Sequence, residues 1–407
     1  MPVKSIDEPF WTDDAELELY AGLKHLDSKE DDIGELRACF IKALSRSQFD
    51  LSFLNERFSD VSSWRSGVVA ELKRAMSLPL HSHPVNSQIL HRVKCDGYDR
   101  EEVVFESAFG CWIPATVLIP DHGQAPFPAV VALHDMGGFR SFGREKLIPF
   151  EGEPDYLKDF RKTNYEGRSI GIELAARGFL VICIDSMMFG ERTPQAWPDK
   201  AAFIRDRLGW TKQNSDQFTR DVSLYSEKIA SNTAILTGLT WSGMIAGDDI
   251  DTVDYLVSRP DVDAGRIGCI GLSYGAYRAN YLAALDERIA AAVSVCWMAT
   301  LDSIVGFNVG GAMGYFTLIP GIHTRLDICD IASLACPRPF MAVSGWGDHL
   351  MQPHGISSAH RKLRKIWSKA GAAEKLGSLC FDSPHEFNTT MQEAAFAWLE
   401  RWLGGKL

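Results

Sequence analysis

The stretch Arg266–Asn280, RIGCIGLSYGAYRAN, decides the fold of this chain. The apolar run 267–270 predicts a strand, the motif GLSYG follows at 271–275, and a helix-compatible segment continues to residue 285. A strand, a G-x-S-x-G turn and a helix in this order predict a nucleophile elbow, whose tight turn leaves no room for side chains at the two glycines. We therefore expect Ser273 to be a nucleophile beside a helix N-terminus, which favours developing negative charge. The alternative for the bare motif is a glycine-rich turn without a catalytic role.

The length and the charge of the chain limit the classes of protein to consider. The chain has 407 residues, a net charge of −11, 46% hydrophobic residues and 23% charged residues, which is typical of a soluble globular protein with one large domain and an extension, or with two or three domains. It contains no dense stripe of Lys and Arg, so nucleic acid is not an expected partner. No signal-peptide pattern opens the sequence and no apolar stretch reaches the ~20 residues that cross a bilayer, so we expect a cytoplasmic protein without a membrane partner.

The nine cysteines are scattered and none forms a C-x-x-C pair. Several lie in apolar runs that are typical of buried strands. This pattern indicates reduced core thiols in a cytoplasmic protein, and neither a disulfide framework nor a metal site is expected.

Composition shifts divide the chain into two parts. Residues 12–77 show helical spacing of apolar residues, and the segment LPLHSHP at 78–84 breaks that pattern. We expect an N-terminal helical extension over 1–84 and a catalytic domain over 85–407. The extension is expected either to cover part of the site or to build a homo-oligomer interface.

Beyond residue 85, strand patterns alternate with helix patterns. Residues 102–107 and 113–119 alternate like an antiparallel pair, whereas 128–133 and 179–184 are continuous apolar runs, typical of parallel strands buried on both faces. Later candidate strands are 290–297, 340–344 and 378–381, and candidate helices are 170–177, 248–258, 357–370 and 390–403. The series predicts an α/β fold with a doubly wound, mostly parallel sheet and antiparallel first strands. Three connections, 139–168, 193–245 and 302–333, are long enough to form a lid or pocket walls.

A serine nucleophile needs a base, and the base needs an orienting acid. After an elbow the acid closes a later strand and the histidine follows the last strand. Asp348 closes the apolar run that begins at Phe340, and His385 follows the run that ends at Phe381. We therefore predict Asp348 and His385 as acid and base, with Asp382 as the rival acid. The other late histidines, which lie in less suitable places, are His349, His354 and His360.

The oxyanion of an acyl-transfer intermediate needs two backbone amides. The residue after the nucleophile, Tyr274, supplies the first, and the loop after an early strand supplies the second. The sequence LHDMGG at 133–138 fits that loop, and its glycines allow close approach of the backbone to a substrate. We favour the Met136 amide as the second donor, with Asp135 as the alternative, while a plain glycine turn stays open.

The ordered motifs resemble those of the α/β-hydrolase superfamily, in particular its dienelactone-hydrolase-like and acetyl-xylan-esterase-like bacterial members. The resemblance covers roughly 90–405 and rests on HDMGGF at 134–139, FGREKL at 142–147, DSMMFGER at 185–192, the run 248–279, the run 327–348 and SPHEF at 383–387. It implies an esterase fold in which Ser273, Asp348 and His385 form the triad.

Two departures from the family pattern matter. Dienelactone hydrolases use a cysteine nucleophile where this chain has Ser273, so their lactone specificity does not carry over. Lipase-type HGGG loops have glycine where Asp135 stands. Because a carboxylate near a forming oxyanion would oppose it, we expect Asp135 to be paired with Arg192 or Arg278.

Apolar side chains at strand ends are candidates for the substrate pocket, although ordinary core packing explains them as well. Arg192, with Glu191, could orient a polar substrate or take part in a structural ion pair. The candidate pocket residues are His134, Met187, Met188, Arg192, Trp297, Met298 and Trp346.

Together these features predict a serine hydrolase that cleaves a small-molecule carboxylic ester through an acyl-enzyme, without a metal or an organic cofactor. An amidase, a peptidase or an acyltransferase could use the same triad. A non-catalytic binding module of the same fold is the alternative from another class.

Overall fold

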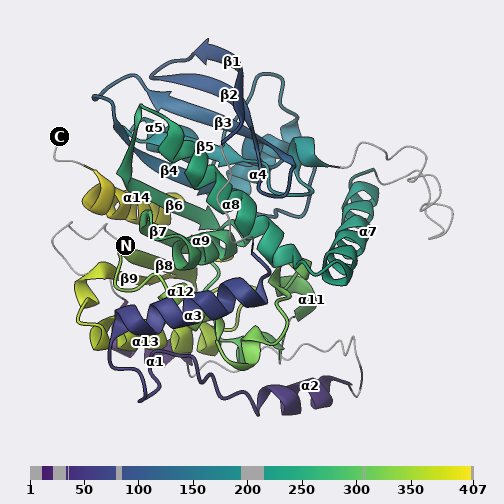
Figure 1. The fold of residues 1–407 in the computed structure, drawn as a ribbon, viewed down its shortest axis with the longest axis vertical. Coiled ribbons are helices and arrows are strands. Elements are labelled where there is room, and N and C mark those ends of the chain that lie inside the picture. Colours follow the sequence, from purple (N-terminus) through teal and green to yellow (C-terminus); the bar gives the residue numbers. More distant parts are fainter. Residues whose placement is uncertain are drawn as a thin grey trace.

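A nine-stranded sheet forms the centre of the computed structural model, which describes residues 12–21, 34, 36–78, 85–193, 215–305, 307 and 309–404 (Figure 1). The strand order across the sheet is β1-β2-β3-β5-β4-β6-β7-β8-β9. The strands are β1 (Ser87–Lys94), β2 (Tyr98–Glu106), β3 (Trp112–Pro120), β4 (Phe127–Leu133), β5 (Leu180–Ile184), β6 (Val262–Leu272), β7 (Ile289–Val295), β8 (Phe340–Gly345) and β9 (Leu376–Phe381).

The strand directions match the sequence pattern. β2 and β3 pair antiparallel with Glu102 opposite Thr116, and β3 pairs antiparallel with β5. From β5 to β9 every neighbouring pair is parallel. The expected mostly parallel sheet with antiparallel first strands is therefore confirmed.

Helices bury both faces of the parallel part of the sheet, which is why its strands are apolar without alternation. Ala129 and Val131 of β4 belong to one hydrophobic cluster, and Val130 and Ala132 belong to the other. The first cluster includes residues of α3 (Val61–Ala75), α8 (Trp241–Ser258), α9 (Tyr274–Leu285), α12 (Ile328–Ser333) and α13 (Pro353–Lys369). The second includes residues of α5 (Ile170–Ala175) and α14 (Thr389–Leu403).

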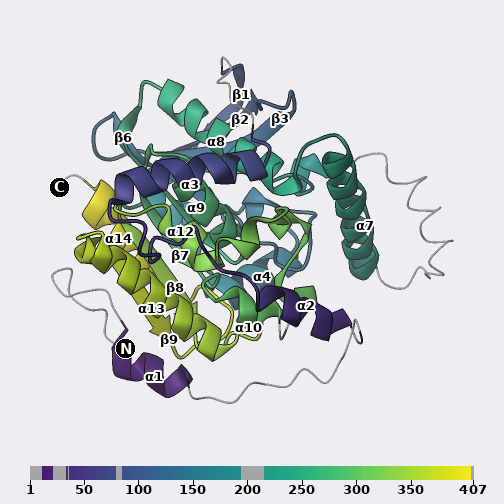
Figure 2. The ribbon, with the colours of Figure 1, turned by 60° about the horizontal axis from the view of Figure 1, so that its bottom comes forward.

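The described N-terminal helices pack on the rest of the chain. They are α1 (Asp14–Ala21), α2 (Leu36–Leu44) and α3. Figure 2 shows α1 below α13, where the Ser357 hydroxyl donates to the Leu17 carbonyl at 3.0 Å, and α3 across α9. Trp64 and Leu72 of α3 are buried in the first cluster together with the sheet. Residues 79–84 of the expected boundary lie outside the described residues.

The long connections carry helices of their own. Residues 139–168 include η1 (Arg144–Lys146) and α4 (Asp155–Tyr165). Of 193–245, the segment 194–214 lies outside the described residues, and α7 (Ser215–Leu236) follows it. Residues 302–333 include η3 (Tyr315–Thr317), η4 (Ile322–Thr324) and α11 (Val309–Ala312). The remaining short helices are η2 (Gly190–Arg192), α10 (Leu301–Val305) and η5 (Ala373–Lys375).

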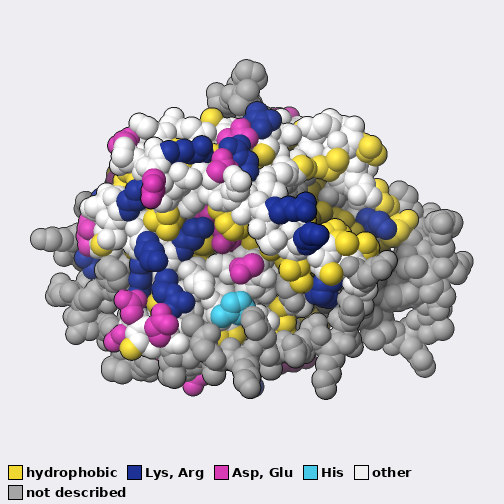
Figure 3. Space-filling view, turned by 90° about the horizontal axis from the view of Figure 1, so that it is seen from below, with side chains coloured by type: hydrophobic (Ala, Val, Ile, Leu, Met, Phe, Trp, Pro, Cys, Tyr) yellow, Lys and Arg dark blue, Asp and Glu magenta, His cyan; other side chains and the backbone are white. Residues whose placement is uncertain are grey.

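The cysteines and the surface agree with these layers. All nine cysteines are free, and six of them are buried. None of the described helices combines the length and the apolar character that a bilayer-spanning segment requires. Seen from below, the described side chains mix Lys and Arg with Asp and Glu, and apolar side chains gather on the right-hand part of this face (Figure 3).

Candidate active site

Ser273 lies at the turn between β6 and α9. Its backbone has φ 57° and ψ −115°, a conformation that non-glycine residues rarely adopt. The turn is tight because α9 starts directly above neighbouring backbone. A Cβ at Gly271 would lie 2.3 Å from the carbonyl carbon of Gly275, and a Cβ at Gly275 would lie 2.0 Å from the Leu133 oxygen. The local geometry is that of the elbow that the sequence predicts, and the Ser273 side chain stays half-buried at the cavity.

Asp348 and His385 meet at the carboxyl ends of β8 and β9. The two atoms Asp348 Oδ2 and His385 Nδ1 lie 2.7 Å apart, and the Asp348 side chain is almost fully buried. The rival acid, Asp382, is exposed. An acid held on Nδ1 leaves Nε2 as the nitrogen that can accept a proton.

The other late histidines have different surroundings. His360 is fully buried in α13, with its two ring nitrogens 2.9 Å from the hydroxyls of Ser344 and Ser378. Burial lowers the pKa of His360 to about 3, so this ring stays neutral. His349 is exposed, and its ring centre lies 5.8 Å from that of His385.

A cavity of about 610 Å³ opens above the elbow, and Ser273 and His385 both line it. Each of the three long connections contributes to its wall: Phe139 and Asn164 from the first, Glu227 from the second and Phe316 from the third. The wall is largely aromatic and aliphatic, as is usual in small-molecule sites.

The predicted oxyanion donors border the same cavity. Tyr274 is the first residue of α9, and Asp135 and Met136 follow β4. Within the described part of the chain, neither the Tyr274 amide nor the Met136 amide donates a hydrogen bond. Two unpaired amides beside a serine hydroxyl are the groups that an oxyanion needs.

The expected ion pair of Asp135 with an arginine is wrong. The Tyr165 hydroxyl donates to Asp135 Oδ1 at 2.6 Å. Burial and the Asp135 charge together raise the pKa of Tyr165 well above its usual value, so this donor keeps its proton.

Both candidate arginines have other acceptors on α8. Arg192 pairs with Asp248 at 2.5 Å, and Arg278 Nε lies 3.1 Å from Asp249 Oδ2. Glu191 pairs with Arg144. Of the two readings of Glu191 and Arg192, the structure thus shows ion pairs within the fold, made with separate partners.

The predicted pocket residues divide clearly. Trp297 lines the cavity, whereas the six others are not among its described lining residues: His134, Met187, Met188, Arg192, Met298 and Trp346. His134 is fully buried, and its Nε2 accepts the Ser186 amide at 3.1 Å. Burial lowers the pKa of His134 well below its usual value. Met298 is buried in the first hydrophobic cluster, and the Trp346 indole N–H lies 3.4 Å from a Glu16 oxygen of α1.

The wall contains a buried ion pair that the sequence pattern did not indicate. Arg140 and Glu227 both line the cavity and pair at 2.5 Å, and the Trp241 indole N–H donates to Glu227 at 3.0 Å. A lone Arg and a lone Glu, 87 positions apart, carry no signal of this contact.

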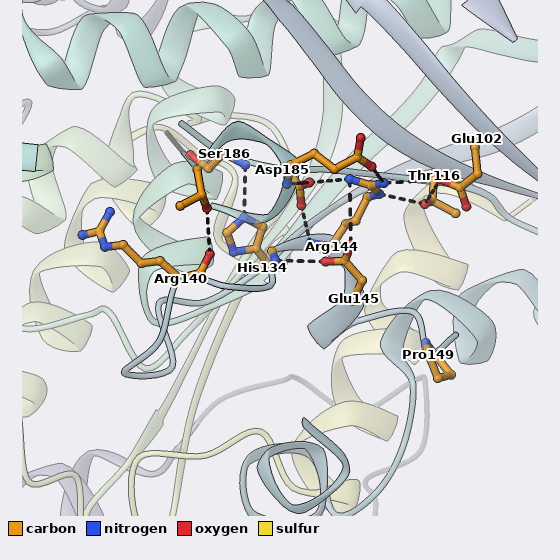
Figure 4. Close-up of polar contacts among 12 residues, drawn as sticks. Glu102, Thr116, His134, Arg140, Arg144, Glu145, Pro149, Asp185 and Ser186 are labelled. Carbon is orange, nitrogen blue, oxygen red and sulfur yellow. Dashed lines mark hydrogen bonds and ion pairs between the residues drawn. The ribbon is translucent and has the colours of Figure 1, made fainter. Parts of the chain in front are cut away.

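A second polar network lies behind the loop that follows β4. Figure 4 shows the Arg144 side chain among Asp185, Thr116 and Glu102. Arg144 is buried, and the surrounding carboxylates keep it charged. The network fixes η1 against the ends of β3 and β5.

One described cluster has ligand types that can bind a metal. Cys296, Asp348 and His385 offer ligand atoms that all lie within 4.8 Å of one another. The cluster suits a metal poorly, because His385 Nδ1 is already bonded to Asp348. Burial also raises the pKa of the Cys296 thiol well above its usual value, and a protonated thiol is a weak ligand.

Comparison with known proteins places this geometry in context. Residues 37–207 match the model of the Abhydrolase family, a match that ends before Ser273. The Bacillus subtilis (strain 168) protein named "Putative hydrolase YtaP" is 28% identical over 290 residues, covering 71% of this chain and 83% of that protein.

Two solved structures are similar over most of the chain. A "putative acetyl xylan esterase" from Bacteroides fragilis has a TM-score of 0.63 at 17% identity, covering 89% of this chain and 86% of its own. A glucuronoyl esterase from Solibacter usitatus has a TM-score of 0.58 at 14% identity, covering 85% and 94%. The chain has the α/β-hydrolase fold, and the resemblance to that superfamily is confirmed.

Proposed function

We propose that this α/β-hydrolase-fold protein is a serine esterase whose catalytic residues are Ser273, His385 and Asp348. The contact that carries the proposal is the one between His385 Nδ1 and Asp348 Oδ2, at 2.7 Å, on the wall of the cavity that Ser273 also lines. It supplies a base with its orienting acid beside an exposed hydroxyl at an elbow.

The reaction runs in two acyl-transfer steps. His385 Nε2 takes the proton of Ser273 Oγ while the serine oxygen attacks the ester carbonyl, and the Tyr274 and Met136 amides bind the oxyanion. His385 then protonates the departing alcohol oxygen, leaving the acyl group on Ser273. Water, activated by the same histidine, releases the acid and restores the serine.

The cavity wall favours an uncharged ester. Arg140 and Glu227 neutralise one another, and the Asp135 carboxylate is bonded to Tyr165. The remaining wall is mostly aromatic and aliphatic. The two similar structures are named for esters of carbohydrates, so we include acetylated xylo-oligosaccharides beside simple acetate esters as candidate substrates.

Hydrolysis of p-nitrophenyl acetate tests the proposal directly. We expect turnover by the wild-type protein and a loss of at least about 10⁴-fold in kcat for Ser273→Ala, since removal of a triad nucleophile typically costs that much or more. Ser45→Ala, at the exposed end of α2, is the matched control and should keep full activity.

A fluorophosphonate probe with mass mapping distinguishes the alternatives. Labelling of Ser273 together with ester turnover supports the esterase. Equal turnover by wild type and Ser273→Ala would remove the nucleophile from the mechanism. Labelling without turnover of any ester would replace the esterase by an acyltransferase or an amidase, and neither labelling nor turnover would leave a binding module.

A further inference from the structure

Lys146, in η1, has a fully buried side chain that ends behind the loop after β4. Its ammonium donates to the carbonyl oxygens of Asp135 at 3.0 Å, Met136 at 2.6 Å and Phe139 at 3.0 Å. An ammonium has three N–H donors, so every donor has a backbone acceptor and all three acceptors belong to one loop. The described lining of the cavity does not include Lys146, so it acts from behind the wall.

Aromatic rings close the site around this ammonium. The Nζ atom lies 4.5 Å from the ring centre of Phe139, 5.0 Å from that of Phe189 and 5.7 Å from that of Phe160. Such rings attract a cation through their faces and exclude water. The loop carbonyls therefore have the ammonium as their donor in place of solvent.

The geometry of the peptide bond links these carbonyls to the oxyanion donors. In a trans peptide the C=O of one residue and the N–H of the next point in opposite directions. Since Lys146 holds the Asp135 carbonyl, it turns the Met136 amide the other way, and the Met136 carbonyl fixes the Gly137 amide in the same manner. The loop that carries these amides lines the cavity with Ser273.

The backbone that bears Lys146 is itself fixed. Arg144, two residues earlier, is held by Asp185 and Thr116, and the Gly143 amide donates to Glu145 at 3.0 Å (Figure 4). Lys146 thus transmits the position of a rigid turn to the loop.

We propose that Lys146 is a positioning residue for ester hydrolysis, which holds the loop 135–139 in the orientation that presents its amides to the oxyanion. The inference rests on the proposed esterase function. It assigns no proton transfer and no substrate contact to the lysine.

The charge of Lys146 is sensitive to pH. Burial lowers the pKa of Lys146 to about 8; Asp135, Glu145 and Asp185 act in the opposite direction, and Arg140 adds to the effect of burial. The neutral amine keeps two N–H donors and turns a lone pair to the third carbonyl, which loosens the loop. We expect kcat to fall as the pH rises through about 8.

Lys146→Met keeps the length of the side chain and removes the three donors. With p-nitrophenyl acetate we expect kcat to fall about 10²- to 10³-fold, the usual effect of losing one oxyanion donor, while KM changes by less than about threefold. Lys146→Arg should fail to rescue kcat, since a planar guanidinium does not match three converging carbonyls. Lys158→Met, on the exposed face of α4, is the control and should match wild type.

The pH profile separates positioning from general destabilisation. Wild-type kcat should decline with a midpoint near pH 8, and Lys146→Met should lack that decline. An unchanged kcat in a folded Lys146→Met protein would overturn the proposal. If that variant does not fold, the wild type decides: a decline near pH 8 with unchanged near-UV circular dichroism supports the proposal, and constant kcat to pH 9.5 overturns it.

Ser273→Ala, measured in parallel, keeps the two proposals distinguishable. If Ser273→Ala abolishes turnover and Lys146→Met does not reduce it, the esterase stands and the positioning role fails. If Ser273→Ala is fully active, the proposed function fails, and the inference about Lys146 fails with it.

Discussion

At the scale of the residue, the Ser273 backbone shows how packing holds an unfavourable conformation. A positive φ costs a non-glycine residue on the order of 1–2 kcal/mol. The surrounding hydrogen bonds offset this cost: the Ser273 amide donates to the Val295 carbonyl at 2.8 Å, and the Tyr277 amide donates to the Ser273 carbonyl at 2.9 Å. Adjacent strand and following helix together determine where the hydroxyl lies.

The glycines of the elbow provide a test at this scale. A Cβ at Gly275 would lie 2.0 Å from the Leu133 oxygen, and backbone cannot move aside as a side chain can. We expect Gly275→Ala to destabilise the protein by about 3 kcal/mol or more and to displace Ser273, with loss of esterase activity. Thermal unfolding and p-nitrophenyl acetate turnover measure the two effects.

Gly67→Ala is the matched control for that substitution. Gly67 lies on the exposed side of α3, and an added Cβ would meet no atom within 4 Å. Replacing glycine by alanine in a helix interior should stabilise the protein by roughly 0.5–1 kcal/mol. Equal melting temperatures for Gly275→Ala and wild type would contradict the close packing of the elbow.

At the scale of the element, the sequence predicts strands and site residues better than it predicts their neighbours. Continuous apolar runs identify β4 and β5 because both faces of a parallel sheet are buried. Asp348 and His385 could be singled out because a strand end fixes where the following residue lies. These features depend on local sequence alone.

The partners of charged groups depend on how helices cross, which spacing does not reveal. Arg278 of α9 meets Asp249 because α8 and α9 pack together, and Asp135 meets Tyr165 because α4 folds back over the loop. The same reason explains the pocket: Met298 and Trp346 follow strands, but their side chains pack on helices and leave the wall to the long connections.

The attachment of α7 to the cavity is testable at this scale. Glu227 of α7 and Arg140 are both buried, with exposed fractions of 2% and 5% for their side chains. Glu227→Gln leaves a buried guanidinium without its counter-charge, which typically costs about 3–5 kcal/mol. We expect a lower melting temperature and a KM raised about tenfold as α7 loosens from the wall.

An exposed pair is the control for this prediction. Asp155 of α4 pairs with Lys158 at 3.0 Å with 92% of its side chain exposed. Asp155→Asn should change the free energy of unfolding by less than about 1 kcal/mol and leave KM unchanged. If Glu227→Gln had equally small effects on both quantities, the ion pair would have no part in holding α7.

At the scale of the whole molecule, thiols are distributed through both hydrophobic clusters. Cys183 and Cys296 lie in one cluster, and the other holds four: Cys269, Cys329, Cys336 and Cys380. Burial raises the pKa of all six above the ordinary value of 9.0, to about 12 for Cys336. Folding therefore depends on these groups staying protonated.

The sign of the pH dependence follows from these shifts. A raised pKa in the folded state gives a stabilising contribution that is complete below pH 9 and is lost as the pH rises, because the unfolded chain releases its thiol protons first. Each such thiol changes the free energy of unfolding by about 1.4 kcal/mol per pH unit above 9. Lys146, with its lowered pKa, acts oppositely between about 8 and 10.5, but it is one group against six.

We therefore expect the free energy of unfolding to fall steeply above pH 9, and urea titrations between pH 7 and 10.5 measure it. A total stability of about 5–15 kcal/mol would be exhausted within roughly two pH units. At pH 7, a thiol reagent should modify the exposed Cys39 and Cys111 quickly and the six buried thiols only on unfolding. Stability that stayed constant from pH 8 to 10.5, or equally fast modification of all nine cysteines, would show that these thiols are not held protonated in a packed core.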